Sequence, residues 1–229
     1  CTQASMDFES AITGVAKTTD LSETELADMR DAIMDMSTRI PATTEEIAGV
    51  AEAAGQLGIQ KDALLDFTET MTMLGTATNM TAEDAATALA RFANITGMSA
   101  DNYGRLGSVI VDLGNNFATT ESEITQMGTR LASGGKLAGL TEPQIMALAA
   151  AMSSVGIEAE AGGTAMTQTL NAIEKSVAIG GDSLTEFARI SGMSAEQFTA
   201  AWNDDALSAL TAFIRGLGDL DSQGESAVL

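Results

Sequence analysis

The stretch Gly139-Leu140-Thr141 joins two helical patterns, and the same order of glycine, apolar residue and hydroxyl recurs as Gly97-Met98-Ser99 and Gly192-Met193-Ser194. Glycine is common just past a helix end because it adopts a left-handed backbone without a Cβ clash, and the apolar residue after it packs back on the last turn. The hydroxyl then caps the next helix. These three joints predict short helices connected by tight turns, with a positive φ at each glycine.

Helix starts are marked by hydroxyl residues followed three positions later by a carboxylate or amide. Thr141 with Gln144 and Ser194 with Gln197 fit the reciprocal capping box, and Ser99 is followed by an acidic residue in its first turn. Apolar residues recur at every third and fourth position between these starts and the next glycine or proline. The two signals predict helices over residues 22–40, 43–58, 64–74, 81–97, 106–117, 120–131, 141–155, 166–177, 183–190, 194–202 and 207–217.

The predicted fold class is therefore all-α: a multi-helix bundle of roughly ten or more short helices joined by tight glycine-containing turns. Strand alternation is almost absent. No fixed period of about 30 to 45 residues repeats with matching side chains, which argues against a regular solenoid. The pattern leaves open whether the bundle is compact or elongated.

Paired glycines divide the chain further. Gly134 and Gly135 predict a break or hinge, because each glycine costs roughly 1 kcal/mol against alanine inside a helix. The pairs at 162–163 and 180–181 are interpreted as turns. The second of these is the only compositional boundary, and it predicts a main helical region over residues 1–179 and a smaller helical piece over residues 180–229.

The chain of 229 residues has a formal net charge of −21, with 11 Lys+Arg against 32 Asp+Glu. Such an excess of negative charge opposes binding to phosphate backbones, so we expect no nucleic-acid ligand. The single cysteine is Cys1, so no internal disulfide is possible. The longest uncharged stretch, residues 143–157, is too short for a convincing membrane span and is interpreted as a buried helix.

The sequence contains few candidates for catalytic or metal-ligating residues. Histidine is absent, which excludes His-activated nucleophiles and His-ligated zinc within this chain. Neighbouring carboxylates such as Glu121 with Glu123 and Asp204 with Asp205 fit helix starts better than paired acid catalysts. The stretch DLDSQG at 219–224 resembles the start of a calcium loop, but its twelfth position falls beyond residue 229. We expect no catalytic residue, no cofactor and no metal.

Several stretches resemble one known family in order and spacing. They are DFE at 7–9, EAAGQLGI at 52–59, ATNMTAEDA at 77–85, LARFA at 89–93, LGNNFATTE at 113–121, SSVGIEAEAGGTA at 153–165 and SGMSAEQF at 191–198. Together they are similar to the core of the TP901-type tail tape measure proteins of bacteriophages and prophages. The resemblance covers nearly the whole chain.

This resemblance implies a structural phage tail protein that occupies the tail tube, fixes tail length during assembly and leaves ahead of DNA at ejection. It implies a place in the virion after assembly in the host bacterial cytoplasm, and it implies no catalytic residues. The partners it suggests are tail tube proteins, tail assembly chaperones and other copies of the chain. The glycine joints exclude one continuous helical rod. We therefore expect this chain to be a folded portion that lies beside the ruler, the extended helical part that measures tail length.

Two other functions remain open from the residues alone. The first is a helical module associated with cell-wall hydrolysis, which would need a cleft holding two carboxylates about 5 to 10 Å apart. The second is a membrane-active helical module. The negative charge disfavours contact with anionic lipid, so we expect no membrane contact from this chain.

Overall fold

The computed structural model describes residues 2–219, and their side chains from residue 6 onward. In this part of the chain every regular element is helical, as the sequence predicts. The elements are α1 (Thr2–Thr18), α2 (Glu23–Arg39), α3 (Thr44–Gln56), α4 (Leu64–Ala77), α5 (Ala82–Thr96), the 3-10 turn η1 (Ala100–Asn102), α6 (Tyr103–Asn116), α7 (Glu121–Leu137), α8 (Glu142–Ser154), α9 (Ala159–Ile179), α10 (Asp182–Ile190), α11 (Ala195–Asp204) and α12 (Ala206–Asp219).

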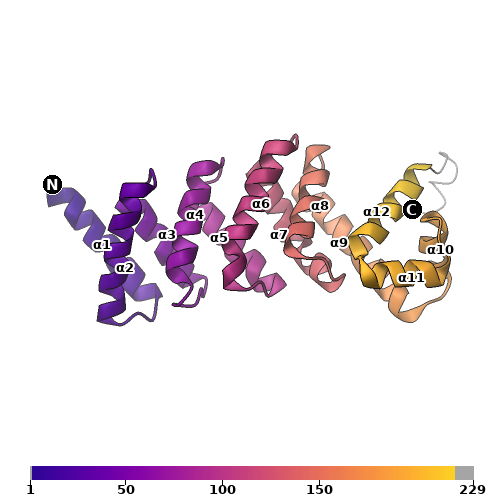
Figure 1. Ribbon diagram of the computed structural model, residues 1–229, viewed down its shortest axis with the longest axis horizontal. Coiled ribbons are helices and arrows are strands. Elements are labelled where there is room, and N and C mark those ends of the chain that lie inside the picture. The colour runs from indigo at the N-terminus through magenta and orange to yellow at the C-terminus, as the bar shows by residue number, and fades with distance from the viewer. Residues whose placement is uncertain (1, 220–229) are drawn as a thin grey trace.

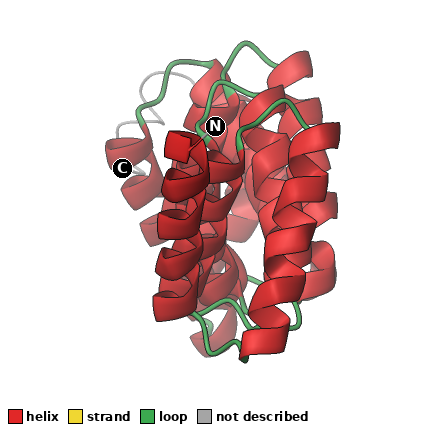
Figure 2. Ribbon diagram, turned by 90° about the vertical axis from the view of Figure 1, so that its left-hand side faces the viewer, coloured by secondary structure: helices red, strands yellow, loops and turns green. Residues whose placement is uncertain are grey.

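The first nine α-helices form two layers of an elongated stack. Helices α1, α3, α5, α7 and α9 contact one another in succession, and α2, α4, α6 and α8 do the same in the second layer. Figure 1 shows the helices following one another along the long axis, and Figure 2 views the stack from one end. The all-α prediction is confirmed, and the shape is elongated. Helix α1 is an element that the periodicity analysis did not assign.

The helix N-caps of one layer of the stack recur at a regular spacing that the side-chain pattern of the sequence did not reveal. Helices α3, α5 and α7 are capped by Thr43, Thr81 and Thr120, which lie 38 (43 to 81) and 39 (81 to 120) residues apart. The expectation against a solenoid is therefore wrong for these hairpins. The period resides in cap positions and burial, since each repeat fills its core with different side chains.

Capping boxes define the starts of α3 and α7 as predicted, and at α5 Thr81 accepts the Asp84 N–H without the reciprocal bond. In α7, the backbone N–H of Glu123 donates to Thr120 Oγ1 at 3.3 Å, and the Thr120 N–H donates to Glu123 Oε2 at 2.9 Å. The box at Thr141 has the same reciprocal bonds. A hydroxyl and a carboxylate or amide thus satisfy N–H groups that a helix start leaves without partners.

The glycine pairs at 134–135 and 162–163 correct two predictions. Both lie inside continuous helices, α7 and α9, and both are buried. A Cβ on Gly135 would lie 2.7 Å from Ile145 Cγ1, and one on Gly163 would lie 2.5 Å from Arg130 Cβ. These glycines allow α7 to approach α8 and α9 closely, so the helix–helix contact outweighs the propensity cost that suggested a hinge.

The pair Gly180-Gly181 is a turn, as predicted, with φ values of 78° and 93° between α9 and α10. The buried helix predicted at 143–157 is found as α8, which buries Ile145, Met146 and four further apolar residues, but it ends at Ser154, and Val155 and Ile157 are exposed.

The core is apolar and leaves no polar side chain unsatisfied among the described residues. Its buried hydroxyls bond within their own helices: Thr68 donates to the Leu64 carbonyl at 2.7 Å and Thr72 to the Thr68 carbonyl at 2.7 Å. Such local bonds satisfy a buried donor without linking helices. Among the described residues, the buried hydroxyls of the core thus bond within their own helices.

Candidate functional site

The three predicted joints lie at separate turns of the molecule. Gly97, Gly139 and Gly192 have φ values of 69°, 78° and 71°, so the predicted positive φ is confirmed at each. In each joint the N–H of the following apolar residue bonds back across the helix end; Met98, for example, donates to the Ala93 carbonyl at 3.1 Å. This bond is typical of a Schellman motif.

The hydroxyls of the joints differ in what they do. Thr141 and Ser194 accept the N3 backbone N–H of α8 and α11. Ser99 precedes the 3-10 turn η1 and makes no side-chain cap bond, so the expected cap is absent there. The nine joint residues do not converge on one place, because Gly97 follows α5, Gly139 follows α7 and Gly192 follows α10.

The same turn occurs at two places that lack the hydroxyl. Gly58 and Gly156 have φ values of 79° and 81°. Ile59 N–H donates to the Ala54 carbonyl at 3.1 Å, and Ile157 N–H to the Met152 carbonyl at 3.2 Å. The glycine and the apolar residue therefore define the turn, and the hydroxyl belongs to the next helix.

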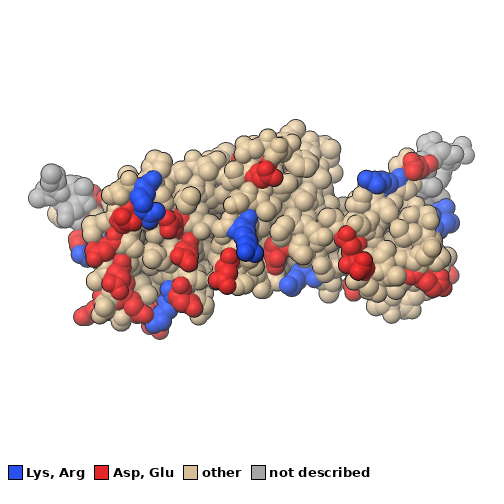
Figure 3. All heavy atoms as spheres, in the orientation of Figure 1, with Lys and Arg blue, Asp and Glu red and all other residues tan. Residues whose placement is uncertain are grey.

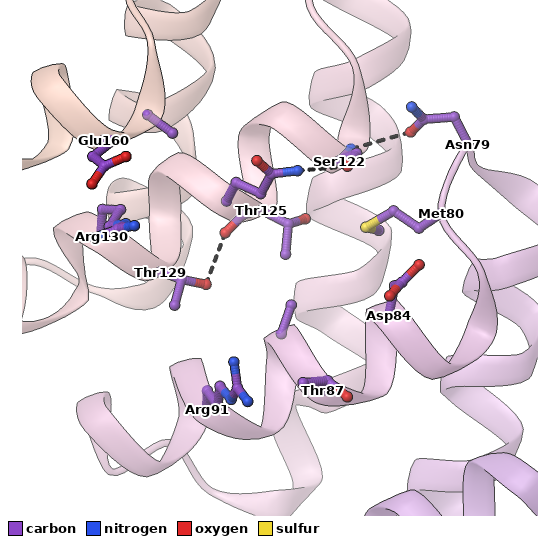
Figure 4. Close-up of a pocket in the computed structure, with 13 residues that line it drawn as sticks. Asn79, Met80, Asp84, Thr87, Arg91, Ser122, Thr125, Thr129, Arg130 and Glu160 are labelled. Atoms are coloured by element: carbon purple, nitrogen blue, oxygen red, sulfur yellow. Dashed lines mark hydrogen bonds between the residues drawn. The ribbon is translucent and has the colours of Figure 1, made fainter.

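A groove of about 530 Å³ lies where α5, α7 and the start of α9 meet (Figure 4). Its two cations, Arg91 and Arg130, share it with the carboxylates of Asp84 and Glu160. No ion pair joins them within the described residues. The other lining residues are Asn79, Met80, Thr87, Ala88, Ser122, Thr125, Gln126, Thr129 and Ala159.

Hydrogen bonds in this groove serve helix geometry. Asn79 Oδ1 accepts the backbone N–H of Ser122 at 3.2 Å, and Gln126 Nε2 donates to Ser122 Oγ at 3.0 Å. Thr129 Oγ1 donates to the Thr125 carbonyl at 2.8 Å. These groups thus bond to the start of α7 and to its backbone carbonyls. Sequence reasoning missed the groove because three distant segments form it.

One carboxylate of each pair considered as a catalyst, Glu123 and Asp205, accepts hydrogen bonds at a helix start. The pKa of Glu123 is lowered by bonds from the backbone and side chain of Thr120 and from the Thr119 hydroxyl. The pKa of Asp205 is lowered by bonds from the Ser208 hydroxyl and backbone N–H at the start of α12. Both carboxylates are thus held ionised, which suits capping and opposes use as a proton donor near neutral pH.

Charged side chains gather at the N-terminal end of the stack. Figure 3 shows them crowded over α2 and its neighbours, with fewer over α6 and α8. Exposed ion pairs join Arg30 to Glu9 at 2.6 Å and Lys61 to Glu25 at 2.8 Å. Exposed pairs of this kind add little stability, so this end is chiefly a solvated acidic surface.

The part of the chain that the structure describes contains no cluster of three or more potential metal-ligating side chains. The possible calcium loop lies outside the described residues, apart from Asp219 at the end of α12, and so does Cys1. Among the described helices, none combines the length and apolar character that a bilayer crossing requires.

The family model that describes the phage-related minor tail proteins matches residues 9–229 of the chain. The chain belongs to this family. The chain is also 29% identical over 174 residues to a probable tape measure protein of Halomonas phage phiHAP-1.

The alignment covers 70% of this minor tail protein and 20% of that relative, so the chain spans about a fifth of the relative's length. No solved structure matches the chain. The two matches confirm the resemblance to phage tail tape measure proteins that the sequence stretches indicated.

Proposed function

We propose that this chain is a folded helical portion of a tape measure protein, which sets phage tail length during assembly and occupies the tail tube before DNA ejection. The observation that carries the proposal is the alignment with a probable tape measure protein over 70% of the chain. The net charge of −21 fits this role, because such a protein would repel passing DNA.

The proposed role of this portion is packing and contact rather than linear measurement. A continuous helix rises about 1.5 Å per residue, so the longest helix, α9 with 21 residues, spans only about 32 Å. Folding into hairpins makes the stack much shorter than the chain stretched as one helix. We place the ruler itself in parts of the full-length protein outside this chain.

Partners follow from the same proposal. They are tail tube proteins, tail assembly chaperones and further copies of the chain, in a virion assembled in the host cytoplasm. We propose no nucleic-acid binding, no membrane contact and no enzymatic activity for this chain. We also propose that residues 1–179 and 180–229 act as a main region and a smaller C-terminal piece.

In-frame deletions in the full-length gene test the proposal, with tail length measured by electron microscopy. Deletions in an extended helical ruler should shorten tails by about 1.5 Å per residue. Removing one hairpin here, residues 82–120, should change tail length by far less than the roughly 60 Å that the same number of ruler residues would remove. The proposal is wrong if no deletion anywhere in the protein alters tail length.

A further inference from the structure

Two arginines occupy the same position in successive hairpins of the stack. Arg91 follows the N-cap of α5 by 10 residues (81 to 91), and Arg130 follows the N-cap of α7 by 10 residues (120 to 130). Figure 4 shows α5 and α7 running in the same direction, with both arginines at the groove between them. Because packed helices lie about 8–10 Å apart, equal positions on α5 and α7 place the two side chains at roughly that separation.

Neither guanidinium group has a partner within the described residues. Arg30, Arg39 and Arg189 form ion pairs with nearby carboxylates. By contrast, no carboxylate oxygen of the described part of the chain lies within 4.0 Å of the guanidinium groups of Arg91 and Arg130. Both side chains are exposed, so their N–H donors are available to a ligand from outside.

Helix α9 positions the side chain of Arg130. Thr167 Oγ1 donates to the Arg130 carbonyl at 3.2 Å. A Cβ on Gly163 would lie 2.5 Å from Arg130 Cβ, so the glycine allows the arginine stem to lie against α9. Holding the stem while the charged end stays in solvent reduces the entropy that a salt bridge to this arginine would cost.

Two carboxylates line the same groove, and both belong to helix starts. Asp84 Oδ2 accepts the Thr81 hydroxyl at 2.8 Å at the start of α5. Glu160 lies in the first turn of α9, where the helix dipole favours a negative charge. In Figure 4, Asp84 lies at the opposite end of the groove from Arg91, and Glu160 lies on the side of Arg130. Glu160 is therefore the internal group that would compete with an acidic ligand for Arg130.

We propose that Arg91 and Arg130 bind an acidic helix of a partner protein, one carboxylate on each arginine. Carboxylates at positions i and i+7 lie on one face of a helix and about 10.5 Å apart, close to the spacing of packed helices such as α5 and α7. Arginine suits this contact because its planar guanidinium donates two parallel N–H bonds to one carboxylate.

The size of the groove fixes how the partner lies. Its volume of about 530 Å³ accommodates carboxylate side chains but not a helix, whose diameter with side chains is about 10–12 Å. The partner helix therefore lies on the surface, across α5 and α7 and along the stack, with its two carboxylates entering the groove.

Charge decides the class of ligand. A nucleic acid brings a continuous row of phosphates to a chain with a net charge of −21, and two arginines do not offset that repulsion. The same repulsion opposes a second copy of the chain. A partner helix can carry one pair of carboxylates on an otherwise neutral or basic surface. The arginine pair then sets the register of a contact that the acidic stack attracts.

Titration of the 229-residue chain with a synthetic helix, followed by NMR at low salt, tests the proposal. The probe is an alanine- and glutamine-based peptide of about 20 residues with two glutamates seven residues apart. It should bind with a Kd on the order of 1 mM and shift the amide signals of α5 and α7. A peptide with the glutamates five residues apart, on different faces of the helix, should bind at least about threefold more weakly.

Variants of the chain locate the contact. Arg91→Gln and Arg130→Gln should each weaken binding about threefold or more, and the double variant should abolish it. Lysine at both positions keeps the charge and most of the stem, so it should retain part of the binding. Glu160→Gln should strengthen binding, because it removes the competing carboxylate. Arg105→Gln is the matched control, since Arg105 is an exposed arginine on α6 outside the groove, and it should leave binding unchanged.

Several results would overturn the proposal. They are no binding at 5 mM peptide, equal binding of the two peptides, equal effects of the Arg105 and Arg91 variants, and weaker binding by the Glu160 variant. A single-stranded oligonucleotide that displaces the peptide from the same arginines would assign the site to phosphates instead. The inference rests on the proposed function only in placing the partner within the tail, so these titrations and the tail-length deletions can fail independently.

Discussion

The stack of α1–α9 and the C-terminal helices α10–α12 are stabilised by different side chains. The stack packs alanine, methionine and glycine at close approach, with Phe67 and Tyr103 in edge contact at a centroid distance of 4.7 Å. The C-terminal helices have only 9 to 14 residues and surround a run of aromatic contacts. That run comprises Phe187–Phe198, Phe187–Phe213 and Phe198–Trp202.

Aromatic side chains provide a large buried area per residue, which suits the C-terminal helices because α10 and α11 have only 9 and 10 residues. Trp202 also ties the two regions together, since its Nε1 donates to Glu174 Oε2 of α9 at 2.8 Å. The stack α1–α9 is therefore stabilised by the close approach of helix backbones, and the C-terminal helices by contacts between large aromatic side chains.

The largest expected loss of stability comes from removing a buried ring in the C-terminal helices. Phe198→Ala removes a fully buried ring that stacks 6.2 Å from Trp202, and it should cost about 3–5 kcal/mol. Trp202, the only tryptophan, reports on the C-terminal helices by fluorescence, while far-UV circular dichroism reports mainly on the stack. In urea, the fluorescence transition should shift more than the dichroism transition.

Phe67→Ala is the matched variant in the stack, because Phe67 is also fully buried. It should shift the dichroism transition more than the fluorescence transition. If both variants shift both transitions equally, the two regions unfold as one cooperative unit and the contrast has no energetic meaning.

Close packing in the stack predicts the next effect. Gly135→Ala should destabilise the protein by about 1–3 kcal/mol, because the added Cβ would lie 2.7 Å from Ile145 Cγ1. Gly218→Ala in α12 is the control, since no atom of the described residues lies within 4 Å of its Cβ position, and it should stabilise by up to ~1 kcal/mol. Equal stabilisation by both changes in urea unfolding would support a hinge at Gly135 instead of a tight contact.

The glycine joints should show smaller and similar effects in both regions. Gly139→Ala in the stack and Gly192→Ala in the C-terminal helices each force a left-handed conformation on a residue with a Cβ, at roughly 1–2 kcal/mol. Asparagine should be tolerated better than alanine at both positions. Thermal unfolding measures these losses, and an alanine variant as stable as the wild type would contradict the left-handed geometry.

The smallest effect concerns pH. Bonds from Lys61 and Ser22 lower the pKa of Glu25 from its ordinary 4.5 to about 2. Its contribution to stability is therefore present above pH ~4.5 and is lost as the pH falls toward 2. Glu25→Gln should reduce the fall in melting temperature between pH 5 and about 2.5.

Glu23→Gln is the control, because the Glu23 side chain makes no hydrogen bond or ion pair within the described residues. It should leave the pH dependence close to that of the wild type. Identical pH profiles for the Glu25 variant and the wild type would show that the pair with Lys61 does not persist in solution.

Helices and caps could be predicted from the sequence because their signals are local. Thr141 and Gln144 lie within one turn of each other, so their spacing alone specifies the capping box. The groove between α5 and α7 could not be predicted in this way. Arg91 and Arg130 share a groove only because α5 and α7 stack, and no periodicity encodes which helices become neighbours.

The sequence by itself determined the all-α class, most helix starts and ends, the left-handed glycines and the family, because each depends on neighbouring residues or on their order along the chain. Only the tertiary structure decided what the glycines at 134–135 and 162–163 do, since a helical glycine looks the same as a hinge until a partner helix lies against it. The two-layer stack was likewise decided by packing. Burial selects which faces meet, and different apolar residues can fill the same layer.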